Sequence, residues 1–257
     1  MNFFVFFSPE DLSIIKNGPA ERRHFLDSEL CQLDKVYLYQ LSNYNKVVLQ
    51  RNKLLKELYL HPDYREVLDV LDMQLVQYGS ALIQRRQTFA EELGEIVHRI
   101  HSQLSGGQEE MELKYEPNVT VDAFAQMLFA NRERDMRLKT TATGPHRDDI
   151  SFVVNGVDIR KFGSQGQQRT AALSLKLSEI ELVKRLIGDT PVLLLDDVLS
   201  ELDSGRQNYL LNSIENIQTL ITCTGLDEFV NHRFSINRIY KVTDGSVTVE
   251  NKQEADR

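Results

Sequence analysis

Apolar residues recur at steps of three and four through two long segments in the first half of the chain. In the first segment, from Asp34 to about Tyr59, they are Tyr37, Leu41, Tyr44, Val48 and Leu55. In the second they are Tyr64, Leu68, Leu71, Leu75, Tyr78, Leu82, Phe89, Leu93, Ile96 and Ile100, with Arg85 interrupting the pattern. This spacing is typical of amphipathic helices. Because only "HPD" separates the segments, the two helices are predicted to pack antiparallel as a coiled-coil-like hairpin; an ordinary helical bundle is the alternative.

The second half of the chain alternates between helical and strand patterns. Strands are predicted for "MELKYEP", "PVLLLDD" and "TLITCT", and helices for 121–138, 165–187 and 205–217. Hairpins are predicted at Asn155-Gly156, the preferred pair for a type I′ turn, and at Asp244-Gly245. Helices that alternate with buried strands predict an α/β lobe with a mainly parallel sheet.

The first residues, "MNFFVFF", are apolar on both faces, which predicts a central strand of a covered parallel sheet. The breakers "SPED" and "NGP" then lead into a short helix, "AERRHFLDSEL". Because a chain rarely begins with a central strand, we expect that residues upstream of Met1 are missing.

The overall composition limits the classes of function. With 41% hydrophobic residues and a formal charge of −8, the chain lacks the basic surplus of a general nucleic-acid binder, so any DNA contact must be a local patch. Cys31 and Cys223 show no metal-ligand spacing and are expected to be reduced thiols. Neither a membrane-spanning run nor a signal peptide is recognisable, so we expect a cytoplasmic protein with no membrane partner.

The stretch "PVLLLDDVLSELD" carries the strongest chemical signal. A buried strand that ends in two carboxylates is the Walker B arrangement, in which Asp196 would hold Mg²⁺ and Asp197 would orient or deprotonate the attacking water. A helix N-cap cluster is the structural alternative. "SELD" follows at once, in the place of the D-loop of ABC ATPases, and ends in Asp203.

One helix upstream, "GSQGQQ" places Ser-x-Gly-x-Gln at a predicted helix N-terminus. The Ser164 hydroxyl, the Gly166 backbone and the helix dipole are suited to a γ-phosphate, with Gln165 and Gln167 beside them. The strand "TLITCT" occupies the place of the switch histidine of ABC ATPases, where this chain has Thr224 or Cys223.

A second stretch, "LSGGQ" (104–108), spells the ABC signature literally but in the wrong place. It ends a predicted helix and leads into a strand, where glycine lets a helix stop, so we expect Gly106 and Gly107 to turn the chain. The chain also lacks GxxxxGK[ST], the loop that cradles phosphates, so this chain alone is expected to bind ATP weakly or not at all.

Taken together, the motifs resemble the bacterial RecF family of DNA recombination and repair proteins. Three stretches carry the resemblance: "PEDLSIIKNGPAERRHFLD", "GPHRDDISF" with "GSQGQQRTAALSLKLSE", and "LLLDDVLSELDSGRQNYLL". The resemblance implies an SMC/ABC-type ATPase head with an inserted antiparallel helical arm, ATP-dependent dimerisation, and binding at single-strand/duplex DNA junctions. It further implies help in loading recombinase as part of an SOS-linked pathway, recombination mediator proteins as partners, and slow ATP hydrolysis in the complete protein.

The same resemblance assigns roles to residues. Asp196 is the Mg²⁺-associated acid, Asp197 is the acid beside the water, and Ser164, Gly166 and Gln167 contact phosphate in trans. The fold is then an α/β head without its N-terminal Walker A part. Its expected divisions are a remnant of the N-terminal ATPase lobe (1–30), a helical arm (31–105), and a C-terminal ATPase lobe with the signature motif and Walker B (106–257).

Basic residues gather in "NRERDMRLKTTATGPHR" and are the candidates for DNA contact. They are Arg132, Arg134, Arg137, Lys139 and Arg147. Interleaved Glu133 and Asp135 weaken the patch, and such a charge mix is often only a solvated helix face. His146, beside Asp148 and Asp149, suggests a metal ligand, but a turn-stabilising role is favoured because no second ligand set accompanies it.

Two other functions compete with DNA repair. One is the ATPase subunit of a transporter, although the helical hairpin favours a head of DNA metabolism. The other is an ATP-independent interaction module, which the missing P-loop supports if Met1 is the true start.

Overall fold

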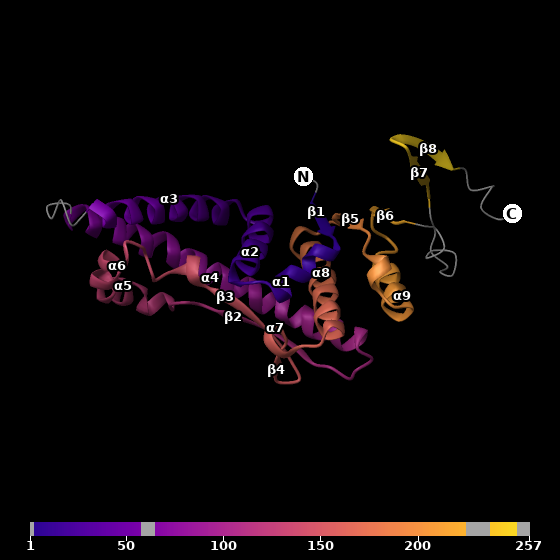
Figure 1. Cartoon of the computed structure of the whole chain (residues 1–257), viewed down its shortest axis with the longest axis horizontal. Helices are drawn as coiled ribbons and strands as arrows, with labels where there is room; N and C mark the ends of the chain where they lie inside the picture. The colour runs from indigo at the N-terminus through magenta and orange to yellow at the C-terminus, as the bar shows by residue number, and fades with distance from the viewer. Residues whose placement is uncertain (1–2, 58–64, 225–236, 251–257) are drawn as a thin grey trace.

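The computed structural model describes residues 3–57, 65–224 and 237–250. Figure 1 shows an elongated molecule in which a helical arm extends from an α/β head. The helices are α1 (Leu12–Lys16), α2 (Pro19–Leu33), α3 (Lys35–Glu57), α4 (Arg65–Leu104), α5 (Val121–Ala130), α6 (Arg132–Leu138), α7 (Ile159–Phe162), α8 (Gln165–Ile187) and α9 (Ser204–Ser213). The strands are β1 (Phe4–Phe7), β2 (Met111–Glu116), β3 (Asp149–Val154), β4 (Val157–Asp158), β5 (Val192–Asp196), β6 (Thr219–Thr222), β7 (Ile239–Thr243) and β8 (Ser246–Glu250).

A parallel sheet of order β1-β5-β6 forms the head, as the alternating pattern predicts. The prediction of a central, covered β1 is wrong for the residues that the structure describes, because β1 lies at the edge of this sheet. Side chains alternate between the faces of a strand. Val5 and Phe7 are therefore buried, whereas Phe4 and Phe6 are about half exposed, at 49% and 50%. The other face of this sheet is thus an apolar surface.

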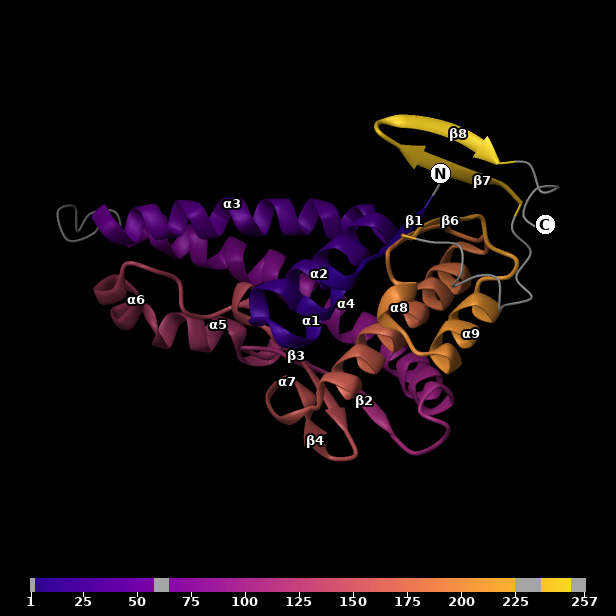
Figure 2. The same ribbon diagram turned by 45° about the vertical axis from the view of Figure 1, so that its right-hand side comes forward.

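The arm consists of α3 and α4, which lie side by side in Figures 1 and 2. Most of the apolar residues that predict the hairpin are buried along these helices, among them Tyr37, Tyr44, Leu68, Leu75, Leu82 and Phe89. The "HPD" turn lies outside the described residues. The predicted helix 121–138 is in fact two helices, because the chain breaks at Asn131, whose Nδ2 donates to Thr143 Oγ1 at 2.9 Å.

An antiparallel sheet of order β2-β3-β4 packs against α4. The predicted turn at Asn155-Gly156 is confirmed, since both residues have positive φ, 47° and 79°. The hairpin β7–β8 likewise turns at Asp244 and Gly245.

The "LSGGQ" stretch ends α4, as expected. Gly106 and Gly107 adopt φ of 63° and 78°, and the Gly107 N–H donates to Ser102 O at 2.7 Å. The left-handed backbone of the two glycines closes the last turn of the helix.

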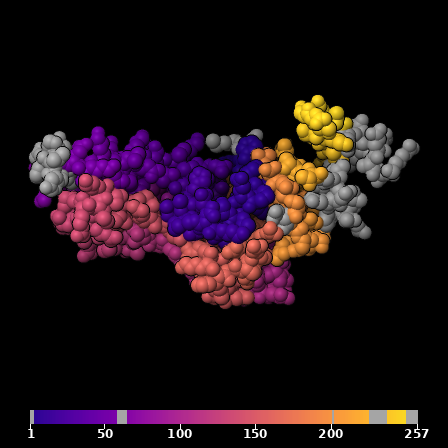
Figure 3. Space-filling model, in the orientation of Figure 1, coloured from indigo at the N-terminus to yellow at the C-terminus, as the bar shows by residue number. Residues whose placement is uncertain are grey.

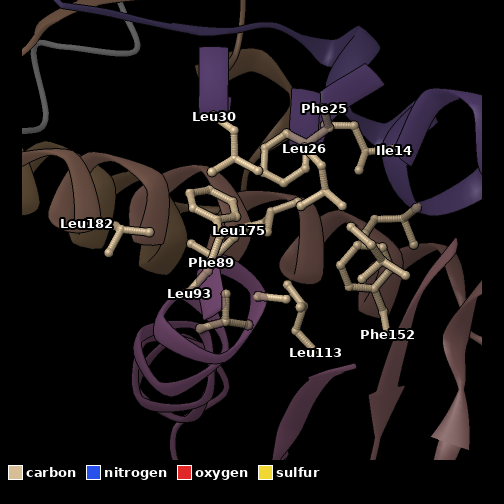
Figure 4. Packing of buried hydrophobic residues seen from close by; sticks show 14 of the residues in the cluster. Ile14, Phe25, Leu26, Leu30, Phe89, Leu93, Leu113, Phe152, Leu175 and Leu182 are labelled. Atoms are coloured by element: carbon tan, nitrogen blue, oxygen red, sulfur yellow. The ribbon is translucent and has the colours of Figure 1, made fainter. Parts of the chain in front are cut away.

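One hydrophobic core runs from the head into the arm. Figure 4 shows side chains of α1, α2, α4, α8, β2 and β3 meeting in it. α8 lies at its centre, with every residue from Thr170 to Ile180 buried. In Figure 3 the indigo segments α1 and α2 occupy the junction between arm and head. α8 packs against α4 of the arm and against α1 and α2 of this junction, so its orientation depends on both parts.

A buried guanidinium joins these layers. Arg86 of α4 donates to Tyr37 Oη at 2.9 Å, to Pro145 O at 2.7 Å, to Asp148 Oδ2 at 3.0 Å and to Asp27 Oδ1 at 2.8 Å. Asp148 is itself buried and accepts from Tyr115 Oη of β2. Burial raises the pKa of Asp148, and the facing Arg86 opposes that rise.

Replacing Arg86 by methionine should lower the free energy of unfolding by about 3–5 kcal/mol, because buried carboxylates lose their cation. Urea denaturation measures the change. The neighbouring Arg85 is a matched control, since it pairs with Asp34 at 3.3 Å in a partly exposed position, and Arg85→Met should cost about 1 kcal/mol or less. Equal losses in the two variants would contradict the central role of Arg86.

Candidate functional site

The two carboxylates that end β5 lie at the carboxyl edge of the parallel sheet. Asp196 is exposed, and its Oδ1 accepts from the hydroxyl of Thr222 on β6 at 2.5 Å. Asp196 and Thr222 are also paired in the strand register. The hydroxyl therefore holds the Asp196 carboxylate at the position where open parallel sheets place their ligands.

Asp197 has an unusual backbone and an unpaired carboxylate oxygen. Its φ is 50°, in the left-handed region that costs a non-glycine residue energy. Its N–H donates to Thr222 O at 3.2 Å and to Thr222 Oγ1 at 3.1 Å. Its Oδ1 is buried without a hydrogen-bond partner in the part of the chain that the structure describes. Such a group usually has an explanation in a ligand, an ion or a function.

These groups fit Mg²⁺ as a partner of a phosphate. Mg²⁺ in phosphate-transfer sites is held by one or two carboxylates, with waters and phosphate oxygens as the other ligands. Asp196 supplies one such carboxylate at the end of β5, and Asp197 follows it directly. Among residues 3–57, 65–224 and 237–250 there is no group of three or more His, Cys, Asp or Glu that could hold a metal alone. The donor set thus suits an ion that arrives with its own oxygen ligands.

Thr222 is a residue of this site that the sequence did not single out. It ends β6 and contacts both aspartates, whereas the position expected for the switch residue, Thr224 or Cys223, follows the end of this strand. The register of two neighbouring strands decides this position, and one strand alone carries no register signal.

The second group of predicted residues begins α8. Ser164 is the N-cap: its Oγ accepts from Gln167 N at 3.2 Å, and Gln167 Oε1 accepts from Ser164 N at 3.0 Å, which completes a capping box. Ser164, Gln165 and Gly166 are exposed at the positive end of the helix dipole. Gly166 has no neighbour closer than Ser164 Oγ, which would lie 3.9 Å from an added Cβ. A phosphate can therefore approach this turn.

Gln167 differs from its two neighbours. Its amide oxygen is used in the capping box, and its Nε2 donates to Glu109 Oε1 at 2.9 Å. The side chain is thus held on both sides by protein groups. The predicted phosphate contact of Gln167 would have to replace one of these bonds or come from its backbone.

Asp203 is the N-cap of α9. Its Oδ1 accepts from Arg206 N at 3.0 Å, and its carboxylate pairs with the Arg206 guanidinium. The hydrogen bond from the Arg206 backbone is the main cause that lowers the pKa of Asp203. No hydrogen bond between described residues links Asp196 or Asp197 to the Ser164–Gln167 turn, so the candidate residues form two separate groups.

The predicted basic residues lie mainly on α6, which Figure 3 shows beside the arm, away from the head. Arg132 pairs with Asp69 at 2.6 Å and with Asp72 at 2.7 Å, so its charge is already compensated. Arg134, Arg137 and Lys139 are exposed, as is Arg147 nearer the junction.

Asp135 does not weaken this basic surface as the sequence suggests. It is fully buried and pairs with Arg51 at 2.7 Å. Glu133 is exposed on the same short helix, so it is the acid of this helix that still faces solvent beside the three cations.

Comparison with known proteins shows extensive similarity. The "DNA replication and repair protein RecF" of Agathobacter rectalis is 62% identical over 245 residues, which are 95% of this chain and 68% of the relative. That of Lachnospira eligens is 61% identical over 249 residues, 96% of this chain and 69% of the relative.

The chain belongs to the RecF family.

Solved RecF structures agree with this assignment. Two structures of "the recombination mediator protein RecF" in the RecFOR pathway, one with ATP and one with ATPrS, superpose with a TM-score of 0.87 at 36% identity. Each match covers at least 96% of this chain and 68% of the solved chain. The predicted fold, an α/β head with an inserted helical arm, is thereby confirmed as that of the RecF structures. A comparison with protein-family profiles gives no match.

Two further sequence expectations concern cysteines and membranes. Neither Cys31 nor Cys223 forms a disulfide. No helix in the described ranges is long and apolar enough to span a bilayer.

His146 stabilises a turn, as favoured from the sequence. Its Nε2 donates to Thr141 O at 3.0 Å, so Nδ1 is the acceptor for Tyr44 Oη at 2.7 Å. Both ring nitrogens are occupied by protein groups, which leaves none for a metal. Gly144, with φ 134°, lies so close to Tyr44 that a side chain there would collide with its hydroxyl.

Burial lowers the pKa of His146 to about 4, and the charges of Arg147, Arg23 and Arg86 act in the same direction. Because the unfolded chain takes up this proton near pH 6.5 and the folded chain does not, stability falls as the pH falls from about 6.5 towards 4. Between pH 7 and pH 4.5, the free energy of unfolding of the unaltered protein should fall by about 2 kcal/mol more than that of His146→Gln. Urea denaturation at both pH values measures the difference, and equal pH dependence in the two proteins would contradict a neutral, buried imidazole.

Proposed function

We propose that this chain works as a nucleotide-gated DNA-binding protein of recombinational repair and replication. The observation that carries the proposal is the arrangement at the sheet edge: Asp196 held by Thr222, beside a strained Asp197 with an unpartnered buried oxygen. The solved relatives with ATP and ATPrS support ATP as the nucleotide.

Each group has a distinct role in this proposal. Asp196 associates with Mg²⁺, which neutralises phosphate charge, and Asp197 orients or accepts a proton from the attacking water. The exposed turn Ser164–Gly166 offers backbone N–H groups and a hydroxyl to a γ-phosphate. The two groups are separate on one chain. We therefore infer that two copies of the protein together complete one phosphate-binding site, in an ATP-dependent homodimer whose interface lies near Asp203.

DNA contact is assigned to exposed cations on and near α6, beside the arm. Arg134, Arg137 and Lys139 share α6 and its end, with Arg147 nearer the head. Junctions of single-stranded and duplex DNA are the proposed target. Loading of recombinase with recombination mediator proteins, in the SOS response, is the proposed outcome, supported by the relatives' assignment to replication, repair and the RecFOR pathway.

Two other functions compete with this proposal. Membership of the RecF family argues against a transporter subunit. An ATP-independent interaction module stays an alternative, because the chain carries no GxxxxGK[ST] loop. The strain at Asp197 favours nucleotide chemistry over that alternative, since a purely structural turn would gain from a glycine or asparagine.

Replacement of Asp197 tests whether this aspartate serves chemistry or folding. Asp197→Asn should raise the free energy of unfolding by about 1 kcal/mol, because a carboxylate with one buried, unpartnered oxygen is replaced by a neutral amide and asparagine tolerates positive φ. Chemical denaturation measures the change. Asp244→Asn is the matched control, an exposed aspartate with φ 49°, and should change stability by less than about 0.5 kcal/mol. A clear loss of stability in Asp197→Asn would indicate a structural role instead.

DNA binding is tested with a variant that carries Arg134→Gln, Arg137→Gln and Lys139→Gln. If the three side chains contact phosphates, the slope of log K against log salt should fall by about 2–3, and affinity at low salt by at least about tenfold. Fluorescence anisotropy with a single-strand/duplex junction gives both quantities. A control with Lys16, Lys35 and Arg185 changed to Gln removes the same charge from exposed positions elsewhere. Absence of binding by the unaltered protein at low salt would overturn the DNA assignment.

A further inference from the structure

The carboxylate of Glu109 lies between the C-terminal end of α4, in the head, and the first turn of α8. Its Oε1 accepts from Gln167 Nε2 at 2.9 Å, and its Oε2 contacts His101 Nε2 at 3.1 Å. Gln167 in turn closes the capping box with Ser164. One carboxylate therefore connects the last turns of α4 to the residues that are proposed to contact phosphate.

The imidazole of His101 fixes this carboxylate from inside the core. His101 is completely buried, and its Nδ1 contacts Ser174 Oγ at 2.9 Å. Burial lowers the pKa of His101, and its Nε2 faces the Glu109 carboxylate. Gln167 and Ser174 are two turns apart on one face of α8, so Glu109 and His101 hold that face at two points.

The "LSGGQ" stretch brings Glu109 back to this place. The left-handed glycines Gly106 and Gly107 reverse the chain after α4, and the Ser105 hydroxyl accepts from Glu109 N at 3.2 Å. The five residues of "LSGGQ" thus form the turn that places the Glu109 carboxylate beside the "GSQGQQ" turn.

The end of α4 makes two more contacts with the head. Arg99 pairs with Glu181 of α8, and Tyr209 Oη of α9 donates to Gln103 Oε1 at 2.5 Å. Both contacts involve exposed side chains, whereas the His101–Glu109–Gln167 contact runs from the core outwards. Among these contacts, that of Glu109 is the one that includes a fully buried side chain, His101.

We propose that Glu109 is a positioning residue, which together with His101 sets the orientation of the first turn of α8 and so links the position of the arm to phosphate contact by Ser164 and Gly166. The link to phosphate rests on the proposed function, whereas the positioning does not. The ligand of this turn is a nucleoside triphosphate, which the turn contacts at the terminal phosphate. Loss of the Glu109 carboxylate leaves the capping box without its outer support.

Hydrogen–deuterium exchange of this chain, followed by NMR, tests the positioning without any nucleotide. In Glu109→Ala, the amides of Gln167 and Gln168 should exchange about five times faster or more, while those of the third and later turns of α8 stay unchanged. Glu110→Ala is the matched control, the adjacent exposed glutamate, and should leave all these rates unchanged. Unchanged exchange at Gln167 in Glu109→Ala and in Glu109→Gln would overturn the proposal.

A reciprocal exchange of the two side chains separates positioning from general destabilisation. Gln167→Glu alone places two carboxylates face to face and should open the turn. Combining it with Glu109→Gln restores one amide and one carboxylate, so protection at Gln168 should return to within about twofold of the unaltered chain. Failure of the double variant to regain protection would count against a direct contact.

ATP-dependent self-association of the full-length protein, measured by analytical ultracentrifugation with Mg²⁺ and ATP, tests the link to phosphate; the full-length protein is used because this chain carries no GxxxxGK[ST] loop. Glu109→Ala should raise the ATP concentration needed for half-maximal association about tenfold, and Glu110→Ala should not. If the unaltered protein associates and Glu109→Ala shows the same ATP dependence, the link is wrong. If the unaltered protein does not associate with ATP, the proposed function fails, and the exchange experiment alone then decides the positioning role.

Discussion

The buried guanidinium of Arg86 is the interaction on which the architecture depends. It comes from α4 and meets groups of α2, of α3 and of the turn before β3, while its partner Asp148 also accepts from Tyr115 of β2. A buried charge is tolerated only when nearly all of its hydrogen-bonding groups are paired. The arm, the junction helices and the antiparallel sheet must therefore meet in one arrangement. A second buried cation, Arg51, pairs farther along the arm with Asp72 and Asp135, while its Nη2 has no hydrogen-bond partner among the described residues.

Local patterns predicted most of the elements. The helix 165–187, the turn at Asn155-Gly156 and the end of α4 at "LSGGQ" all follow from periodicity and from residues with positive φ. The pattern failed where tertiary contacts decide. The break at Asn131 depends on its bond to Thr143, the exposure of Phe4 and Phe6 depends on which strands are present beside β1, and Thr222 depends on the register of β5 with β6.

The candidate site shows a similar division. Asp196, Asp197 and Ser164 could be predicted as candidates because their positions follow from a strand end and a helix start. Glu109 and His101 could not, because they are separated from Gln167 by more than fifty residues and no local spacing relates them. Residues that bind directly leave a motif in the sequence, whereas those that hold a motif in place are found only from contacts. The first turn of α8 shows that a capping residue can stay accessible, since Ser164 caps the helix and is exposed to solvent.

The length of α4 gives the molecule a mechanical property. Its 40 residues extend for about 60 Å at a rise of about 1.5 Å per residue. A tilt of only about 5° at the head end would move the arm end by about 5 Å, a displacement comparable to one helical turn. A force applied to the far end is correspondingly multiplied at the head. The helix is thus a lever, and its short end is the pair of turns that carries His101.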